Sequence, residues 1–110
     1  MSVTDEEMRQ LLADSRVYTL LVLRDGPNKE TADRSALVWE HGRRNLGLKN
    51  DGRMPVVCAV DDDSDLCGVA VLDMELDEAR RVIEGDPGVQ AGIFTYELHT
   101  TRSFPGSALR

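Results

Sequence analysis

His41 is the side chain of this sequence best suited to move a proton near neutral pH. An unperturbed imidazole titrates in that range, so histidine is the usual general acid or base. At helical spacing this histidine shares one stripe with Leu37, Arg44 and Leu48. The two leucines place the stripe near a core. His41 is therefore either a structural histidine with a hydrogen-bond partner or a catalytic group at a cleft between a helix and a sheet.

Other side chains of the same segment could contact a small molecule. Arg44 lies on the His41 stripe and could hold an anionic substrate, as could Arg43, which a solvated helix face explains equally well. Trp39 is the only tryptophan. It could line a ligand pocket or a dimer surface, or anchor a core or an interface. His99 stands among threonines and a leucine, which favours an exposed strand position.

A second carboxylate candidate lies in the run from Gly85 to Gly92. Asp86 suits the N-cap of a short helix, and Pro87 suits its first position, where a missing N–H costs nothing. Gly92 is placed to end that turn as a C-terminal glycine. The run therefore predicts one helical turn whose cap is Asp86.

The spacing of apolar and turn residues predicts seven elements. A capping box, Thr4 with Glu7, opens the first helix, and Thr31 and Asp77 are the expected caps of the next two. The expected helices span residues 4–14, 31–50 and 77–84, and the expected strands span 16–23, 54–60, 66–74 and 93–101. After the first helix this order is βαββαβ, the ferredoxin-like α+β arrangement. Two of the strands are apolar on both faces, which predicts a homodimer that covers the sheet.

Composition and charge exclude several classes of protein. A chain of 110 residues is expected to form one domain, and its 41% hydrophobic and 30% charged content is typical of a soluble protein. The formal net charge of −7 argues against a nucleic-acid partner and against an anionic membrane. No apolar run is long enough for a membrane span, and the N-terminus does not resemble a signal peptide, so a cytoplasmic location is expected.

Neither a metal nor a cofactor is expected. Cys58 and Cys67 lack the partners of a zinc motif and should be free thiols. The acidic run 61–65 would need glycine and glutamate at two calcium-loop positions that Leu66 and Leu72 occupy, so it is expected to be a solvated hairpin tip. The sequence also lacks a phosphate loop, a dinucleotide fingerprint and a nucleophile elbow.

The order of a helix, the Asp86–Pro87 turn, Gly92 and a final strand resembles the end of a YCII-related domain. Sequences of that family typically have a histidine in the long helix eleven residues before a glycine, as His41 and Gly52 do here. The resemblance implies a dimeric α+β-barrel fold over residues 16–104, with a helical extension at 1–15 and a tail at 105–110. It also implies that His41 pairs with Asp86, directly or through one water, at a pocket between helix and sheet.

The chain departs from the family pattern at two positions next to His41. Family members usually have leucines one and four residues after the histidine, where this chain has Gly42 and Asn45. The family also tends to have glycine-proline after its second strand, where this chain has Ala59 and Val60.

Two functions follow from the resemblance and from the residues. The family is similar in fold to muconolactone isomerases, which implies a small-molecule enzyme, an isomerase or lyase with a His–Asp acid–base pair. The alternative is a non-catalytic dimeric module that binds a ligand or assists another protein, and the scarcity of polar site residues favours it. An open pocket beside His41 would separate the two.

Overall fold

A computed structural model describes residues 1–107 and residue 109 of the chain. Its elements are α1 (Asp5–Ala13), β1 (Arg16–Asp25), α2 (Arg34–Asn50), β2 (Val56–Ala59), β3 (Leu66–Leu72), α3 (Leu76–Glu84), α4 (Pro87–Gln90) and β4 (Phe94–Ser103). The four strands form one antiparallel sheet in the order β2-β3-β1-β4. The expected ferredoxin-like α+β class is confirmed, with α1 ahead of it and α4 as the single turn expected after Asp86.

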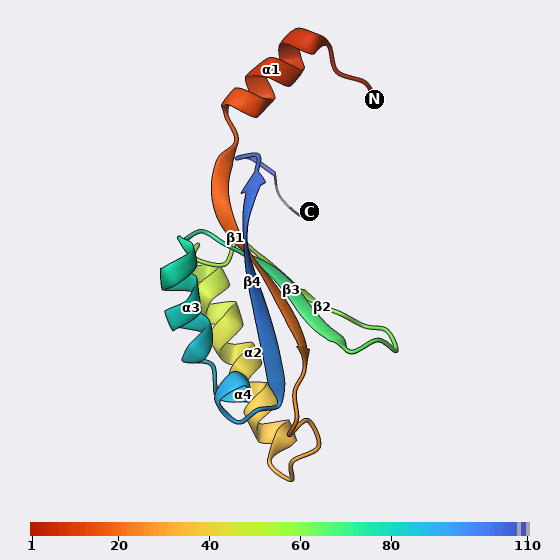
Figure 1. The fold of residues 1–110 in the computed structure, drawn as a ribbon, viewed down its shortest axis with the longest axis vertical. Helices are drawn as coiled ribbons and strands as arrows, with labels where there is room; N and C mark the ends of the chain where they lie inside the picture. Colours follow the sequence, from red (N-terminus) through yellow and green to blue (C-terminus); the bar gives the residue numbers. More distant parts are fainter. Residues whose placement is uncertain (108, 110) are drawn as a thin grey trace.

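The helices α2, α3 and α4 lie together on one face of the sheet (Figure 1). Leu21 and Leu23 of β1 point to that face, beside Ala70 and Leu72 of β3, and they belong to one buried cluster. Leu48 is the buried residue that α2 contributes to this cluster, and Ala79 and Ile83 are those that α3 contributes. The core is therefore a single apolar layer between the sheet and its helices.

The opposite face of the sheet is also apolar, but no described element covers it. Side chains alternate along a strand, so Leu20 and Val22 point away from the helices. Their cross-strand neighbours on β3 are Val71 and Val69, and further across are Val56 and Cys58 of β2. We call these six residues the open face.

The helix α1 stands apart from the body of the protein. Its capping box is present: the Thr4 side chain accepts a hydrogen bond from the Glu7 backbone, and the Glu7 side chain accepts one from the Thr4 backbone. None of its residues is buried, and Figure 1 shows it beyond the end of the sheet. The described chain is accordingly elongated, with extents of 55 × 29 × 23 Å.

Two expected helix starts are wrong by a few residues. The helix α2 begins at Arg34 rather than after Thr31, and its N-cap, Asp33, makes no side-chain capping bond. The loop before it is held by the turn between α4 and β4 instead, because the backbone N–H groups of Gly26 and Asn28 donate to the carbonyls of Ile93 and Gly92. This tertiary contact keeps the residues around Thr31 in turns.

The helix α3 begins at Leu76, one residue before Asp77, the expected cap. Its N-cap is Glu75, which also makes no side-chain capping bond. The chain just before it is fixed by the sheet, since the hydroxyl of buried Thr19 donates to the carbonyl of Met74 at 2.9 Å. That contact sets where the strand ends and leaves Glu75 extended at the start of the helix.

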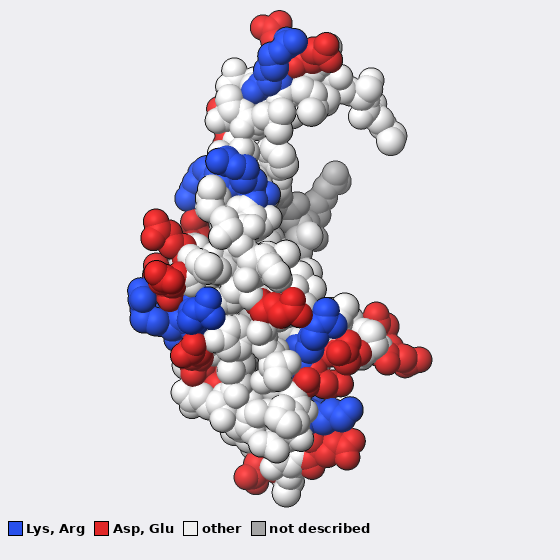
Figure 2. Space-filling view, in the orientation of Figure 1, with Lys and Arg blue, Asp and Glu red and all other residues white. Residues whose placement is uncertain are grey.

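Charged side chains are dispersed over the described surface except at one tip. On the face shown in Figure 2, acidic side chains gather at the β2–β3 hairpin, while both signs alternate over α3. Hydrogen bonds from the hydroxyl and the backbone N–H of Ser64 lower the pKa of Asp62 in this hairpin. No helix among the described residues is long and apolar enough to cross a membrane.

The two cysteines are free thiols in different environments. Cys58 is exposed on the open face, whereas Cys67 lies at an irregularity in the β1–β3 register and is half-buried. The Cys67 thiol donates to the Asp25 carboxylate at 3.2 Å. Burial and this carboxylate raise the pKa of Cys67 to about 11.

We predict that iodoacetamide alkylates Cys58 well before Cys67 in the folded protein near neutral pH. The thiolate is the nucleophile, and a raised pKa keeps Cys67 protonated until the pH approaches about 11. The rate at Cys67 should therefore climb with pH beyond the ordinary thiol pKa of 9.0. Peptide mass spectrometry reads both sites, and Cys58→Ser should leave Cys67 equally slow. Equal labelling of the two thiols would contradict this environment for Cys67.

Candidate active site

His41 and Asp86 meet where α2 passes the N-terminus of α4. The Nδ1 atom of His41 lies 2.8 Å from Oδ1 of Asp86. The other carboxylate oxygen, Oδ2, accepts hydrogen bonds from the backbone N–H groups of Gly88 at 2.9 Å and Val89 at 3.1 Å. Asp86 is only 2% exposed. One carboxylate therefore caps α4 and holds the imidazole at the same time.

Two glycines of the local sequence, Gly88 and Gly92, allow the chain to pack closely around His41. Gly88 lies so close to Phe94 that an added Cβ would be 2.7 Å from two ring atoms. The absence of that carbon lets the Phe94 ring lie beside the imidazole, with ring centroids 4.7 Å apart. Gly92 has a φ of +74°, which glycine adopts at little cost, and it turns the chain from α4 into β4.

The hydrogen bonds fix which imidazole nitrogen carries the proton. The other two partners of the Asp86 carboxylate are N–H donors, so Nδ1 of His41 is assigned the N–H that completes the set. Nε2 is then the unprotonated nitrogen, and the Asn45 amide nitrogen lies 3.3 Å from it. A carboxylate that bonds an imidazole in this way fixes the tautomer and the orientation of the ring.

A cavity of about 380 Å³ opens beside His41, between α2 and the first three strands. Its floor is made of small side chains, among them Ala70, Gly68 and Ala59, and Gly42 gives it room on the helix side. His41 and Asn45 are the polar side chains that α2 contributes to its lining, and Cys58 and Cys67 border it from β2 and β3. The His41 side chain is 15% exposed, so it is neither sealed in the core nor free in solvent.

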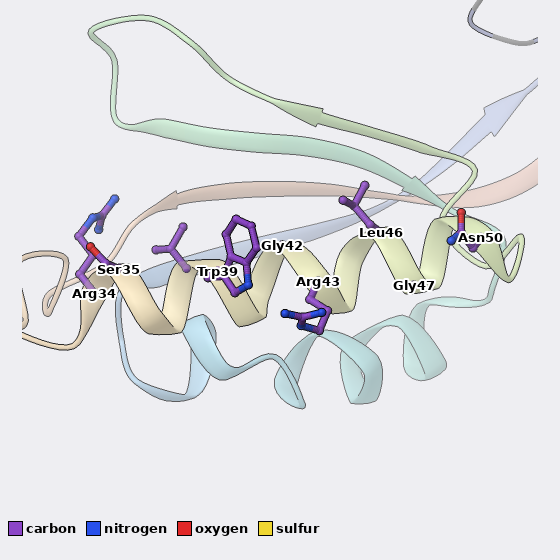
Figure 3. A pocket seen from close by; sticks show the side chains of 9 residues that line it. Arg34, Ser35, Trp39, Gly42, Arg43, Leu46, Gly47 and Asn50 are labelled. Atoms are coloured by element: carbon purple, nitrogen blue, oxygen red, sulfur yellow. The ribbon is translucent and has the colours of Figure 1, made fainter.

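The structure places the two expected substrate-binding residues outside this cavity. Arg44 points toward the end of α3, where its guanidinium lies against Gly85 and its Nη1 atom is buried without a hydrogen-bond partner. Trp39 is 70% exposed and lines a second hollow of about 700 Å³ along α2 (Figure 3). The two hollows share Val38, Gly42 and Leu46.

Asn45 is the site residue that reasoning from the sequence missed. It is 9% exposed and is the one polar neighbour of Nε2. The available signal was its position four residues after His41, which places both side chains on one face of the helix. His99, as expected, is exposed on β4, where it bonds to Glu97.

His41 and Asp86 together have the features of a general acid–base pair in which the imidazole carries the proton. An oriented imidazole lines a mostly apolar cavity, and a buried carboxylate lies beside it to stabilise the positive charge that protonation would create. Among the described residues, no group of three or more His, Cys, Asp or Glu side chains could hold a metal ion.

Comparisons with known proteins agree with the sequence resemblance. The YCII-related domain family matches residues 17–100. No curated protein matches the chain. The chain is similar to one solved structure, that of the 5-chloro-2-hydroxyhydroquinone dehydrochlorinase TftG from Burkholderia phenoliruptrix AC1100 in complex with 2,5-dihydroxybenzoquinone. The two sequences are 14% identical, and the TM-score is 0.48. The match covers 74% of this chain and 90% of that chain. Because the family match spans more than half of the sequence, this chain belongs to the YCII-related domain family.

Proposed function

We propose that this protein is a small-molecule enzyme that moves a proton at a carbon next to a carbonyl group, as an isomerase or lyase does. The observation that supports the proposal best is the 2.8 Å contact between His41 Nδ1 and Asp86 Oδ1, which leaves Nε2 directed away from the carboxylate. The cavity beside that nitrogen gives a substrate a place to bind.

In the proposed step His41 is the base. Its Nε2 lone pair takes a proton from the carbon, the C–H electron pair moves into an enolate, and the imidazole becomes an imidazolium that Asp86 stabilises. Where the enolate is conjugated with a carbon–carbon double bond, the same Nε2–H then returns the proton to the γ-carbon of this dienolate, which moves the double bond and regenerates the neutral histidine. Asn45 donates to the unprotonated Nε2, so its amide must turn away before that lone pair can take the substrate proton. The turned amide can then accept from the protonated nitrogen, which makes Asn45 a positioning residue.

The cavity also limits the substrate class. Its volume of about 380 Å³ suits a small molecule, and its lining has no charged side chain besides the titratable histidine and cysteines. An uncharged, mostly apolar carbonyl compound fits this lining better than a phosphorylated or highly anionic one. The guanidinium of Arg44, which faces α3, does not change this charge balance.

The second candidate is a ligand-binding module without catalysis. The observation that favours it is the same apolar lining, in which His41 and Asn45 are the strongest hydrogen-bonding groups. Binding without proton exchange would support this candidate, whereas exchange that depends on His41 would support the enzyme.

We predict that the protein catalyses hydrogen–deuterium exchange in D2O at the α-carbon of at least one member of a panel of cyclic ketones, enones and lactones. His41→Asn should lower that rate by about a hundred-fold or more, since it removes the base. Asp86→Asn should lower it about ten- to hundred-fold, because an amide offers one acceptor where three N–H donors converge. Proton NMR of the substrate gives the rates.

His99→Asn is the matched control, because it changes the other histidine at an exposed position on β4. Its exchange rate should equal that of the unchanged protein. Exchange that survives His41→Asn would contradict the assigned role, and bound compounds that never exchange would leave the ligand-binding module as the better account.

We predict further that Gly42→Ala and Gly47→Ala have the same effect on stability and different effects on exchange. Space for a Cβ is open at both positions, and each change should raise the free energy of unfolding by roughly 1 kcal/mol through helix propensity. Only Gly42 lines the His41 cavity, so only its substitution should slow exchange. Equal exchange rates in the two variants would contradict the placement of the substrate.

We also propose that the protein is a homodimer that buries its open face. Four of the six open-face residues are valines, and Leu20 lies among them, in a pattern typical of a sheet that is covered on both sides. Val22→Glu should raise the dimer dissociation constant about ten-fold or more, because it places a charge in that layer.

Sedimentation equilibrium measures this dissociation constant. Val17→Glu is the control, since it adds the same charge to the same strand on the other face, at a position that is already 51% exposed. A monomer at micromolar concentration, or equal weakening by both variants, would contradict the open-face dimer.

A further inference from the structure

Two apolar surfaces outside the cavity have no partner within the described chain. The first is one side of α1, where Met8, Leu11 and Leu12 follow each other at helical spacing and are 44%, 46% and 55% exposed. Because its capping box is complete, α1 is a formed helix although it packs against nothing. We call this apolar side and its helix the arm.

The second surface is the hollow along α2, which we call the α2 groove. Its apolar lining is Val38, Trp39 and Leu46, with Gly42 and Gly47 between them. Trp39 is 70% exposed and Leu46 is 56% exposed, and Figure 3 shows both on one side of α2, with α3 and α4 on the other side. A largely exposed tryptophan beside an exposed leucine is the composition of an interface anchor rather than of an ordinary solvated surface.

We propose that the arm of one protomer docks in the α2 groove of a second copy of this chain. The fit is that of an amphipathic helix in an apolar groove, with anchors at positions i, i+3 and i+4. The charges are complementary as well. The arm and its end have four carboxylates (Asp5, Glu6, Glu7 and Asp14) and one arginine (Arg9). The groove is flanked by Arg34, and by Arg43, which also pairs with Glu40 on its own helix.

The glycines of the groove favour the approach of another helix. An added Cβ at Gly42 or Gly47 would meet no atom within 4 Å, so the surface there is open and has no side chain to hold a second helix away. Backbones come closest where such small residues line the contact, and this lets the anchors of the arm reach Trp39 and Leu46.

The arm does not lie along the groove of its own chain in this structure. Only Asp14 and Ser15 separate it from Arg16, the first residue of β1, and it stands beyond the end of the sheet (Figure 1). Trp39 lies three helical turns, about 16 Å, before Asn50 at the end of α2. The arm is only about 13 Å long, so it is shorter than the stretch of α2 from Asn50 to Trp39. The groove of a second copy is not joined to the arm by this two-residue link.

Docking of the arm would complete the wall of the His41 cavity. The groove and the cavity share Val38, Gly42 and Leu46, so a helix seated on these residues covers the outer side of the cavity. This inference does not depend on catalysis, because the contact between arm and groove can be observed without any substrate. The open face and the groove are separate surfaces, on opposite sides of the sheet.

Trp39 reports on the groove directly because it is the only tryptophan in the chain. The emission of the unchanged protein should shift to shorter wavelength as its concentration is raised, since docking removes Trp39 from water. Leu12→Glu should move the midpoint of this shift to a concentration about ten-fold higher or more, which is the order expected for losing one buried leucine. Ala13→Glu adds the same charge at the next residue, which lies away from the side formed by Met8, Leu11 and Leu12. It should leave the midpoint of the emission shift unchanged.

A mixing experiment distinguishes a second copy from other occupants. Leu12→Glu protein keeps Trp39 but has a defective arm, whereas Trp39→Phe protein has an intact arm and no tryptophan. Adding an excess of the Trp39→Phe protein should restore the short-wavelength emission of the Leu12→Glu protein. No restoration, or an equal midpoint for Leu12→Glu and Ala13→Glu, would overturn the proposal whether or not the carbonyl exchange is observed.

Discussion

The contact between His41 and Asp86 is the interaction on which the rest of the site depends. Asp86 is almost fully buried and uses its two oxygens for two tasks, one for the imidazole and one for the backbone of α4. A buried carboxylate without such partners would be costly. The short helix α4, the turn into β4 and the orientation of the histidine are therefore fixed together.

The shape of the cavity follows from small residues rather than from a gap in the fold. Gly68 and Ala70 of β3 lie under α2, and Gly42 and Asn45 lie above them on the helix. Gly42 and Asn45 are the two positions at which the chain lacks the leucines usual after the histidine in this family. Two leucines there would occupy the space beside Nε2, so these departures are consistent with a pocket that this chain keeps open.

Local signals in the sequence predicted the parts of the structure that local interactions determine. The Thr4 capping box, the Asp86 cap with Pro87 and the glycine at 92 are confirmed, because each is stabilised by atoms a few residues away. The starts of α2 and α3 were less predictable, since contacts with the turn before β4 and with β1 decide them. Arg44 shares a helical stripe with His41, yet it turns toward α3, because a spacing argument gives the side of a helix and not its neighbours.

The central claim is that Asp86 selects the imidazole tautomer in which Nε2 is free. Long-range nitrogen–proton NMR of the imidazole of His41, with exposed His99 as the internal reference, measures this tautomer directly. Neutral His41 should have its proton on Nδ1, and Asp86→Asn should shift the proton toward Nε2. A neutral His41 protonated on Nε2 in the unchanged protein would contradict the account.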